Sequence, residues 1–152
     1  MISNLVLSSE QVRQLEAACD RFRVASRAVE VHLIDRHGMP ISVLSGGPQV
    51  LNVDAVASLA ASNFATSVAL AQLVDETSFG LQVLQGADVG MVLAPLGRRL
   101  LIVACFDEKS SSGLVQWALD QLHRQISPLI RDLDGDSALK STPPLLKQSV
   151  EN

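Results

Sequence analysis

Apolar residues recur every three or four positions near the start of the chain, between residues 8 and 25. This spacing places them on one face of an α-helix. Ser8 or Ser9 precedes the first of them and can cap the N-terminus of the helix. We therefore expect a first helix with one buried face. The repeating positions are Val12, Leu15, Ala18, Cys19 and Phe22.

The period changes to two in the segment that follows. Apolar and polar residues alternate over residues 29–33 and again over residues 41–43, with His37-Gly38 as a turn signal between them. Alternation on both sides of a turn is typical of a β-hairpin. In this pattern Glu30 and His32 are the polar positions of the first strand.

Three further apolar runs follow in the second half of the chain, over residues 79–86, 89–96 and 98–108. Glycine-containing turns separate them, as expected for short strands joined by hairpins. The run from Leu100 to Phe106 is apolar without a break, which indicates a strand covered on both faces.

Residues 111–133 return to helical spacing, with Pro128 inside the run. A proline at that place predicts a kink or an early end of the helix. Residues 134–152 are polar, contain prolines and lack any period, so we predict a disordered tail. A short leucine-containing peptide that docks on a partner is the alternative.

The expected element order is helix, two strands, helix, three strands, helix. Because hairpins connect the strands, the sheet should be antiparallel, and a strand covered on both faces needs helices on both sides of that sheet. The predicted fold class is α/β, a three-layer α/β/α sandwich around a five-stranded antiparallel sheet, formed by residues 1–133.

The middle helix has an unusual composition. From Ala55 to Val74 it contains no charged residue, although Asp54, Asp75 and Glu76 flank it. On a helical wheel the larger side chains gather on one side, which we expect to face the sheet. These side chains are Val56, Leu59, Asn63, Leu70 and Val74.

Small or uncharged groups fill most of the remaining circumference. They let another backbone approach closely, and their burial costs little desolvation. A patch of this kind on a helix about 30 Å long is larger than a monomer ordinarily exposes. A second polypeptide should cover it, and another copy of the chain is the first candidate. The predicted partner and dimer surface comprises Ala57, Ala61, Ser62, Phe64, Ala65, Thr66, Val68, Ala69 and Gln72.

The alternative is a helix that lies centrally in its own domain, wrapped by the two terminal helices. The hypothesis of a partner surface on the middle helix predicts that Ala61→Arg or Ala65→Arg leaves a folded protein that no longer binds its partner or a second copy of the chain.

Composition and charge argue against several classes of partner and location. The net charge of −4, with basic residues spread along the chain, argues against a nucleic-acid partner. The middle helix holds too many polar residues for a membrane span, and no secretion signal is evident. Cys19 and Cys105 lack metal or redox spacing, so we expect reduced, buried thiols and a cytoplasmic protein.

The sequence provides no catalytic constellation. The three histidines form no ligand set, and Ser110-Ser111-Ser112 is better explained as a helix cap than as a nucleophile cluster. The glycine turns lack the lysine of a phosphate loop. We expect no metal, no cofactor and no enzymatic activity of the chain's own.

Taken together, the motifs IDRHGMPI, VLSSEQVRQLEAACDRF and LLIVACFDEKSSSGLV, in this element order and with the Ser/Ala-rich middle helix, resemble the Roadblock/dynein light chain superfamily. Within it the chain is most similar to the bacterial MglB type, over roughly residues 4–133. The resemblance implies a Roadblock/longin-like fold and a homodimer that joins middle helices and the adjacent edge strand, here 79–85.

The resemblance also implies a partner, a small Ras-like GTPase of the MglA type, whose GTP hydrolysis the dimer stimulates without an arginine finger in cell polarity or motility. A dimeric scaffold that recruits a GTPase or polarity factor without activating it is the alternative. The chain departs from the family at Gln116 and Trp117, where members commonly carry arginine after the Gly-Leu-Val. Arg98 and Arg99 could reach a GTPase from a hairpin tip, but a solvated turn is the simpler explanation.

Overall fold

The computed structural model describes residues 5–135, and within them the predicted element order is confirmed. The three helices are α1 (Ser9–Ser26), α2 (Val53–Leu73) and α3 (Ser112–Leu133). The five strands are β1 (Glu30–Asp35), β2 (Pro40–Ser45), β3 (Gln82–Gln85), β4 (Gly90–Leu96) and β5 (Leu100–Phe106). The predicted tail lies, from residue 136 on, outside the described residues.

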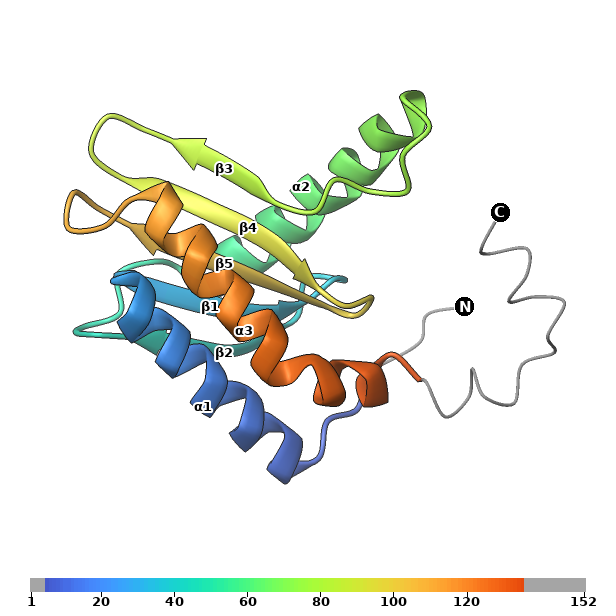
Figure 1. The fold of residues 1–152 in the computed structure, drawn as a ribbon, viewed down its shortest axis with the longest axis horizontal. Coiled ribbons are helices and arrows are strands. Elements are labelled where there is room, and N and C mark those ends of the chain that lie inside the picture. The colour runs from blue at the N-terminus through green and yellow to red at the C-terminus, as the bar shows by residue number, and fades with distance from the viewer. Residues whose placement is uncertain (1–4, 136–152) are drawn as a thin grey trace, which may run out of the picture.

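The strands form one antiparallel sheet in the order β2-β1-β5-β4-β3. Helices α1 and α3 lie together on one face of the sheet and α2 lies on the other, as Figure 1 shows. The three-layer sandwich predicted from the sequence is therefore confirmed. Strand β5 is central, and each of its residues is buried, in agreement with its unbroken apolar run.

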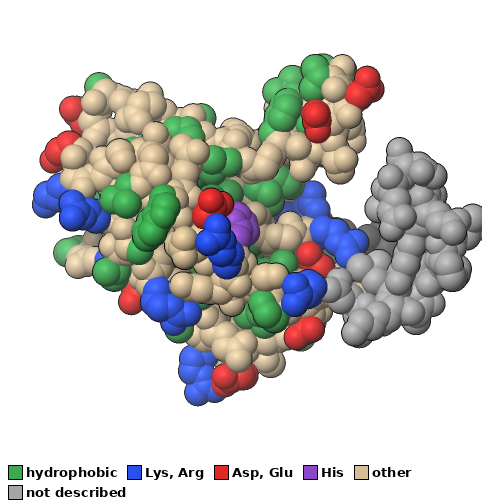
Figure 2. Space-filling view, in the orientation of Figure 1, with side chains coloured by type: hydrophobic (Ala, Val, Ile, Leu, Met, Phe, Trp, Pro, Cys, Tyr) green, Lys and Arg blue, Asp and Glu red, His purple; other side chains and the backbone are tan. Residues whose placement is uncertain are grey.

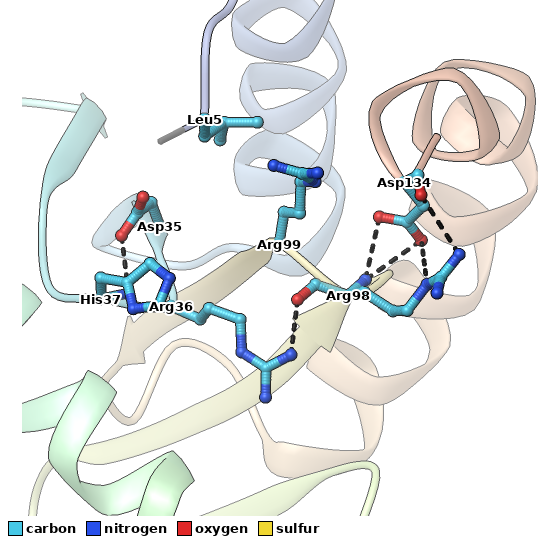
Figure 3. Close-up of a pocket in the computed structure, with 7 residues that line it drawn as sticks. All are labelled: Leu5, Asp35, Arg36, His37, Arg98, Arg99 and Asp134. Carbon is cyan, nitrogen blue, oxygen red and sulfur yellow. Dashed lines mark hydrogen bonds and ion pairs between the residues drawn. The ribbon is translucent and has the colours of Figure 1, made fainter. Parts of the chain in front are cut away.

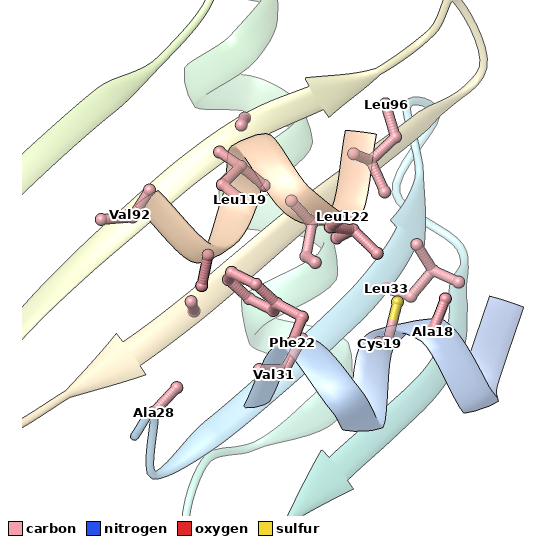
Figure 4. Packing of buried hydrophobic residues seen from close by; sticks show 14 of the residues in the cluster. Ala18, Cys19, Phe22, Ala28, Val31, Leu33, Val92, Leu96, Leu119 and Leu122 are labelled. Carbon is pink, nitrogen blue, oxygen red and sulfur yellow. The ribbon is translucent and has the colours of Figure 1, made fainter. Parts of the chain in front are cut away.

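The two faces of the sheet are packed very differently. Large aliphatic side chains of α1, α3 and the sheet, together with Phe22, fill the space between the α1–α3 pair and the sheet (Figure 4). On the α2 face the buried cluster is small and consists of Ile34, Ala57, Ala60, Leu101 and Val103. This asymmetry indicates that α2 lacks much of the cover that α1 and α3 give each other.

The predicted helix caps are present. Ser8 caps α1 and Asn52 caps α2, each accepting a hydrogen bond from a backbone N–H three residues on. Ser111 does the same for α3 and thereby explains the serine cluster. Helix α3 does not end at Pro128 but continues to Leu133, because Ile126 and Leu133 are buried on either side of the proline and hold the last turns in place.

The β1–β2 hairpin supports α2. Gly38 has a φ of +97°, a conformation that glycine adopts without strain. A Cβ at this position would lie 3.5 Å from the Cα of Ser58 and 3.8 Å from the Cβ of Ala61. The turn thus approaches the α2 backbone closely, and this approach depends on small residues on both sides.

Glu30 and His32, the polar positions of the first strand, are both buried. Both side chains are 1% exposed, because β1 lies between β2 and β5 and beneath the segment that leads into α2. His32 Nε2 lies 2.5 Å from Glu30 Oε1. The Glu30 carboxylate also accepts backbone hydrogen bonds from Val50 at 2.8 Å and Leu51 at 3.3 Å, just before the Asn52 cap.

This carboxylate should make stability depend on pH. Burial raises the pKa of Glu30, but the hydrogen bonds from Val50, His32 and Leu51 outweigh burial and leave the pKa below its ordinary value of 4.5. A lowered pKa means that the stabilisation is present above pH 4.5 and is lost as the pH falls through the folded-state value. Glu30→Gln should lose about 2 kcal/mol at pH 7 and show a flatter decline in acid.

Urea unfolding at fixed protein concentration between pH 7 and pH 3 measures this effect. Glu108→Gln, at an exposed position, is the matched control and should follow the wild type. Equal acid sensitivity of Glu30→Gln and the wild type would contradict the assigned role.

Candidate interaction surface

Helix α2 rests on the sheet through its smallest side chains. The buried residues of the helix are Ala57, Ala60, Ala61, Ser67 and Ala71. Alanine side chains let the helix axis approach the sheet and the Gly38 turn. The same choice means that the helix buries little apolar area within its own chain.

Val56 and Phe64 pack partly against the sheet, but the three leucines of α2 are exposed. Leu59 is 69%, Leu70 53% and Leu73 80% exposed. Helix α2 crosses behind the sheet and its C-terminal part extends beyond the strands (Figure 1). Figure 2 shows hydrophobic side chains gathered on this projecting end. An isolated chain would therefore present a leucine-rich ridge to water, which a soluble monomer rarely does.

The predicted orientation of α2 is therefore wrong in its rotation. Of the stripe expected to face the sheet, Leu59, Leu70 and Val74 are exposed, and only Val56 and Asn63 are partly covered. The expectation rested on large residues facing the interior. Here the interior side is alanine, and the large residues lie where a second polypeptide can cover them.

The residues predicted to form the partner surface fall into three groups. Ala57 and Ala61 are buried against the sheet and cannot face a partner. Ala61→Arg therefore tests the stability of the fold and not the surface. Phe64 and Val68 are half-buried, and the guanidinium of Arg36 lies 5.1 Å from the centre of the Phe64 ring. The exposed members are Ser62, Ala65, Thr66, Ala69 and Gln72.

A groove of about 340 Å³ runs between α2 and the outer strands of the sheet. Val56, Leu59 and Asn63 line its helix side, and of the sheet side the sequence indicated only the edge strand 79–85. Leu84 of β3 and Met91 of β4 are directly paired, so their side chains share the α2 face. The alternation of β4 could have identified Met91 and Leu93, because residues 92, 94 and 96 face the opposite core.

Strand β3 forms one edge of the sheet, next to this groove. It is short, pairs only with β4 among the described strands, and exposes Val83 and Leu84 by 39% and 47%. Its outer backbone groups are a template for another strand. The groove and the edge strand are thus two open surfaces side by side.

By length and composition alone, α2 is the one helix among residues 5–135 that could cross a membrane. Its packing argues for a protein environment, because a row of its alanines contacts the sheet and Asn63 lies in the groove. The exposed side also carries Ser58, Ser62 and Gln72, which hydrocarbon disfavours.

The described residues bring together no candidate metal-ligand group. Within residues 5–135 no three His, Cys, Asp or Glu side chains come together. Burial, and then the charge of Glu16, raises the pKa of the Cys19 thiol to about 12, so this thiol stays protonated.

The arginines considered as a finger lie beside a surface depression at the β4–β5 turn (Figure 3). The Asp134 carboxylate accepts hydrogen bonds from the Arg98 backbone N–H at 3.0 and 3.1 Å, and the Arg98 guanidinium donates to the Asp134 carbonyl at 3.1 Å. Arg36 donates to the carbonyl of Arg98 at 2.6 Å. These hydrogen bonds hold Arg98 in the β4–β5 turn and connect this turn to Asp134 at the end of α3.

Sheet order, the α1–α3 pair and the solitary α2 define a Roadblock-type domain. Several solved structures share it: Myxococcus xanthus MglB has a TM-score of 0.77 at 30% identity, covering 85% of this chain and 96% of that one. The gliding protein MglB from Thermus thermophilus has a TM-score of 0.78 at 25% identity, covering 87% and 99%. An MglB with tetrameric arrangement has 0.79 at 26%, covering 88% and 99%.

These similarities cover nearly the whole length of the relatives, and the chain belongs to the MglB family. A Roadblock/LC7 domain from Streptomyces avermitilis, with a TM-score of 0.58 at 14% identity, shares the fold alone. No protein-family model and no curated protein sequence matches the chain.

Proposed function

We propose that the protein is a homodimeric regulator that binds a small Ras-like GTPase of the MglA type and stimulates its GTP hydrolysis, in the cytoplasm and in the service of cell polarity or motility. The observation that carries the proposal is the uncharged, leucine-bearing side of α2 beside an open edge strand, in a chain of the MglB family. Both surfaces need protein cover, and neither contains reactive groups.

In the proposed dimer, the leucine-bearing side of α2 and the edge strand β3 are covered by the same second copy. Pairing β3 with the same strand of a second copy continues the sheet, and it brings the second α2 over the groove between α2 and the outer strands. The exposed apolar residues of α2 and β3 then become interior. A twofold arrangement needs only one surface type, because each copy supplies the same patch.

The opposite flank of α2 remains for the GTPase. At 100° per residue, Ser58, Ala65 and Gln72 lie on a side of the helix that is turned away from Leu59 and from the groove. From Ser58 to Gln72 this flank consists of small, uncharged or amide side chains and is exposed. We assign it, with Ser62 and Ala69, as the surface that receives the GTPase.

Activation on such a surface works through shape. Arg98 is held by Asp134, and the flank itself carries no charge that could neutralise a developing phosphate charge. A regulator of this kind accelerates hydrolysis by binding the GTPase more tightly when its own catalytic groups are in the productive arrangement. A rigid dimeric platform is suited to that task.

Single-turnover GTP hydrolysis tests the proposal. The purified MglA-type GTPase of the same organism, loaded with GTP, should hydrolyse it at least about tenfold faster when the protein is present in excess, a barrier reduction of about 1.4 kcal/mol. Binding without any change in rate would leave the scaffold alternative in place. An absence of binding would contradict both functions.

A further inference from the structure

The side of α2 that runs from the groove to the exposed leucines carries a heptad pattern. Spacings of three and four alternate along it, as in the seam of a coiled coil. Four of the six positions are aliphatic and two are polar, and the two polar ones lie in the middle. The positions are Val56, Leu59, Asn63, Thr66, Leu70 and Leu73.

The Asn63 side chain lacks a hydrogen-bond partner for its amide oxygen in a single chain. Its Oδ1 is buried and accepts no hydrogen bond from any described residue. The groove around it is apolar, formed by residues such as Leu59, Leu93 and Val103. An unpaired buried amide oxygen costs about 1–3 kcal/mol, so the side chain gains by turning towards a donor, and no described residue of the single chain supplies one.

The orientation of a second α2 follows from the proposed dimer, on which this inference rests. An antiparallel β3–β3 pair is generated by a twofold axis perpendicular to the sheet. Helix α2 lies in a layer parallel to the sheet (Figure 1). A half-turn about that axis reverses any direction within the layer, and therefore the two α2 helices run antiparallel.

We propose that Asn63 and Thr66 form a polar layer across the dimer that fixes the register of the two α2 helices. In an antiparallel pair the two kinds of heptad position face each other. Setting Asn63 opposite the partner's Thr66 sets Leu59 opposite the partner's Leu70, and Val56 opposite the partner's Leu73. All six heptad positions are then paired across the dimer, and the contact between Asn63 and Thr66 occurs twice.

The Thr66 hydroxyl is available for this contact. It is exposed and donates to the Ser62 carbonyl at 3.0 Å in the single chain. That carbonyl keeps its helical N–H partner when the hydroxyl turns. Because Asn63 Oδ1 is covered by its own chain, the side chain takes another rotamer in the dimer, which brings Oδ1 to the surface of the groove, where the hydroxyl of the partner's Thr66 donates to it.

A shift by one heptad in either direction breaks this match. Asn63 then faces the partner's Leu59 or the partner's Leu73, and both amides of the dimer are buried without a partner. Two unpaired amides cost about 2–6 kcal/mol and shorten the aliphatic overlap as well. One buried asparagine among leucines is a known device for selecting a single register.

Charge and area identify the occupant as a second copy. The heptad positions themselves carry no charge, and Asp54, the one charged residue within α2, lies on the back of the heptad, so the paired faces bring no like charges together. The face is about 26 Å long, and one helix strip is smaller than the roughly 800 Å² per partner of a stable interface. The groove and β3 supply the remaining area only if the occupant has an α2 and a β3 of its own.

Disulfide trapping tests the register. In a Leu59→Cys/Leu70→Cys double variant, mild oxidation should give a covalent dimer in high yield, because the two positions face each other across the axis. Neither single variant should do so. The native Cys19 and Cys105 are buried and provide the background control.

The role of Asn63 is tested by two further variants. Asn63→Leu in the double-cysteine background should keep the dimer but lower the trapped yield severalfold, because the register spreads. Asn63→Asp should raise the dimer dissociation constant about 100-fold at pH 8 and recover towards pH 4, where the carboxyl group is protonated and can again be buried.

The outcomes distinguish a failure of the proposed dimer from a failure of the proposed register. A wild type that sediments as a monomer overturns the dimer itself. A wild-type dimer in which the 59–70 pair is not trapped, or in which Asn63→Cys alone gives the covalent dimer, overturns the register. A trapped yield unaffected by Asn63→Leu overturns the role of the polar layer.

Discussion

Leu59→Asp should convert the protein to a monomer at micromolar concentration. The side chain is 69% exposed in the single chain and lines the groove that we assign to the second copy. The substitution removes apolar contact and places a carboxylate in a desolvated interface, at about 2–4 kcal/mol for each site. A twofold interface contains the site twice, so the dissociation constant should rise about 10³-fold or more.

Sedimentation equilibrium measures the mass directly, and circular dichroism checks that the fold persists. Ala65→Asp is the matched control, because it adds the same charge to the same helix on the opposite flank, where Ala65 is exposed. The control should remain dimeric. Equal behaviour of the two variants would mean that the leucine side of α2 is not the dimer face.

Much of the fold follows from short-range patterns. Alternation on both sides of His37-Gly38 predicts the hairpin, and the structure places Gly38 at the positive φ that such a turn requires. The unbroken run from Leu100 to Phe106 predicts a strand buried on both faces, and β5 is central. The caps at Asn52 and Ser111 follow from residues that accept backbone hydrogen bonds.

The rotation of α2 about its axis could not be obtained in the same way. A helical wheel gives the angle between Ala57 and Leu59, but it does not say which of them faces the sheet. The usual rule puts the larger residue inside, and it holds when a chain buries its apolar surface by itself. In α2 the alanines face the sheet and the leucines face outward, and in the dimer that we propose these leucines become interior.

The polar positions of β1 show a second limit of pattern analysis. Glu30 and His32 alternate with aliphatic residues as they would on a half-exposed strand, yet both are buried. What decides their burial is the segment before α2, whose N–H groups of Val50 and Leu51 reach the Glu30 carboxylate. These partners lie about 20 residues away along the chain, beyond any local period.

Ala57→Arg should unfold the protein, while Ala65→Arg should leave its stability unchanged. Ala57 is fully buried beside the Gly38 turn, and its carbonyl oxygen lies within 3.8 Å of a Cβ placed on that glycine. An arginine there must displace the turn or bury its charge, which costs about 4 kcal/mol or more. Ala65, eight residues further along the helix, is exposed, and an arginine there should change stability by less than about 0.5 kcal/mol.

Urea unfolding at fixed concentration measures both variants, and the folded one then separates the two flanks of α2. Ala65→Arg should keep the dimer, because the leucine side is untouched, and should weaken GTPase binding about tenfold or more through steric exclusion from a flank of small residues. Retained GTPase affinity in Ala65→Arg would move the GTPase to another surface of the dimer. A stable, folded Ala57→Arg would instead show that α2 does not rest on the sheet through its alanines, and with that the assignment of its leucines to a second copy would lose its basis.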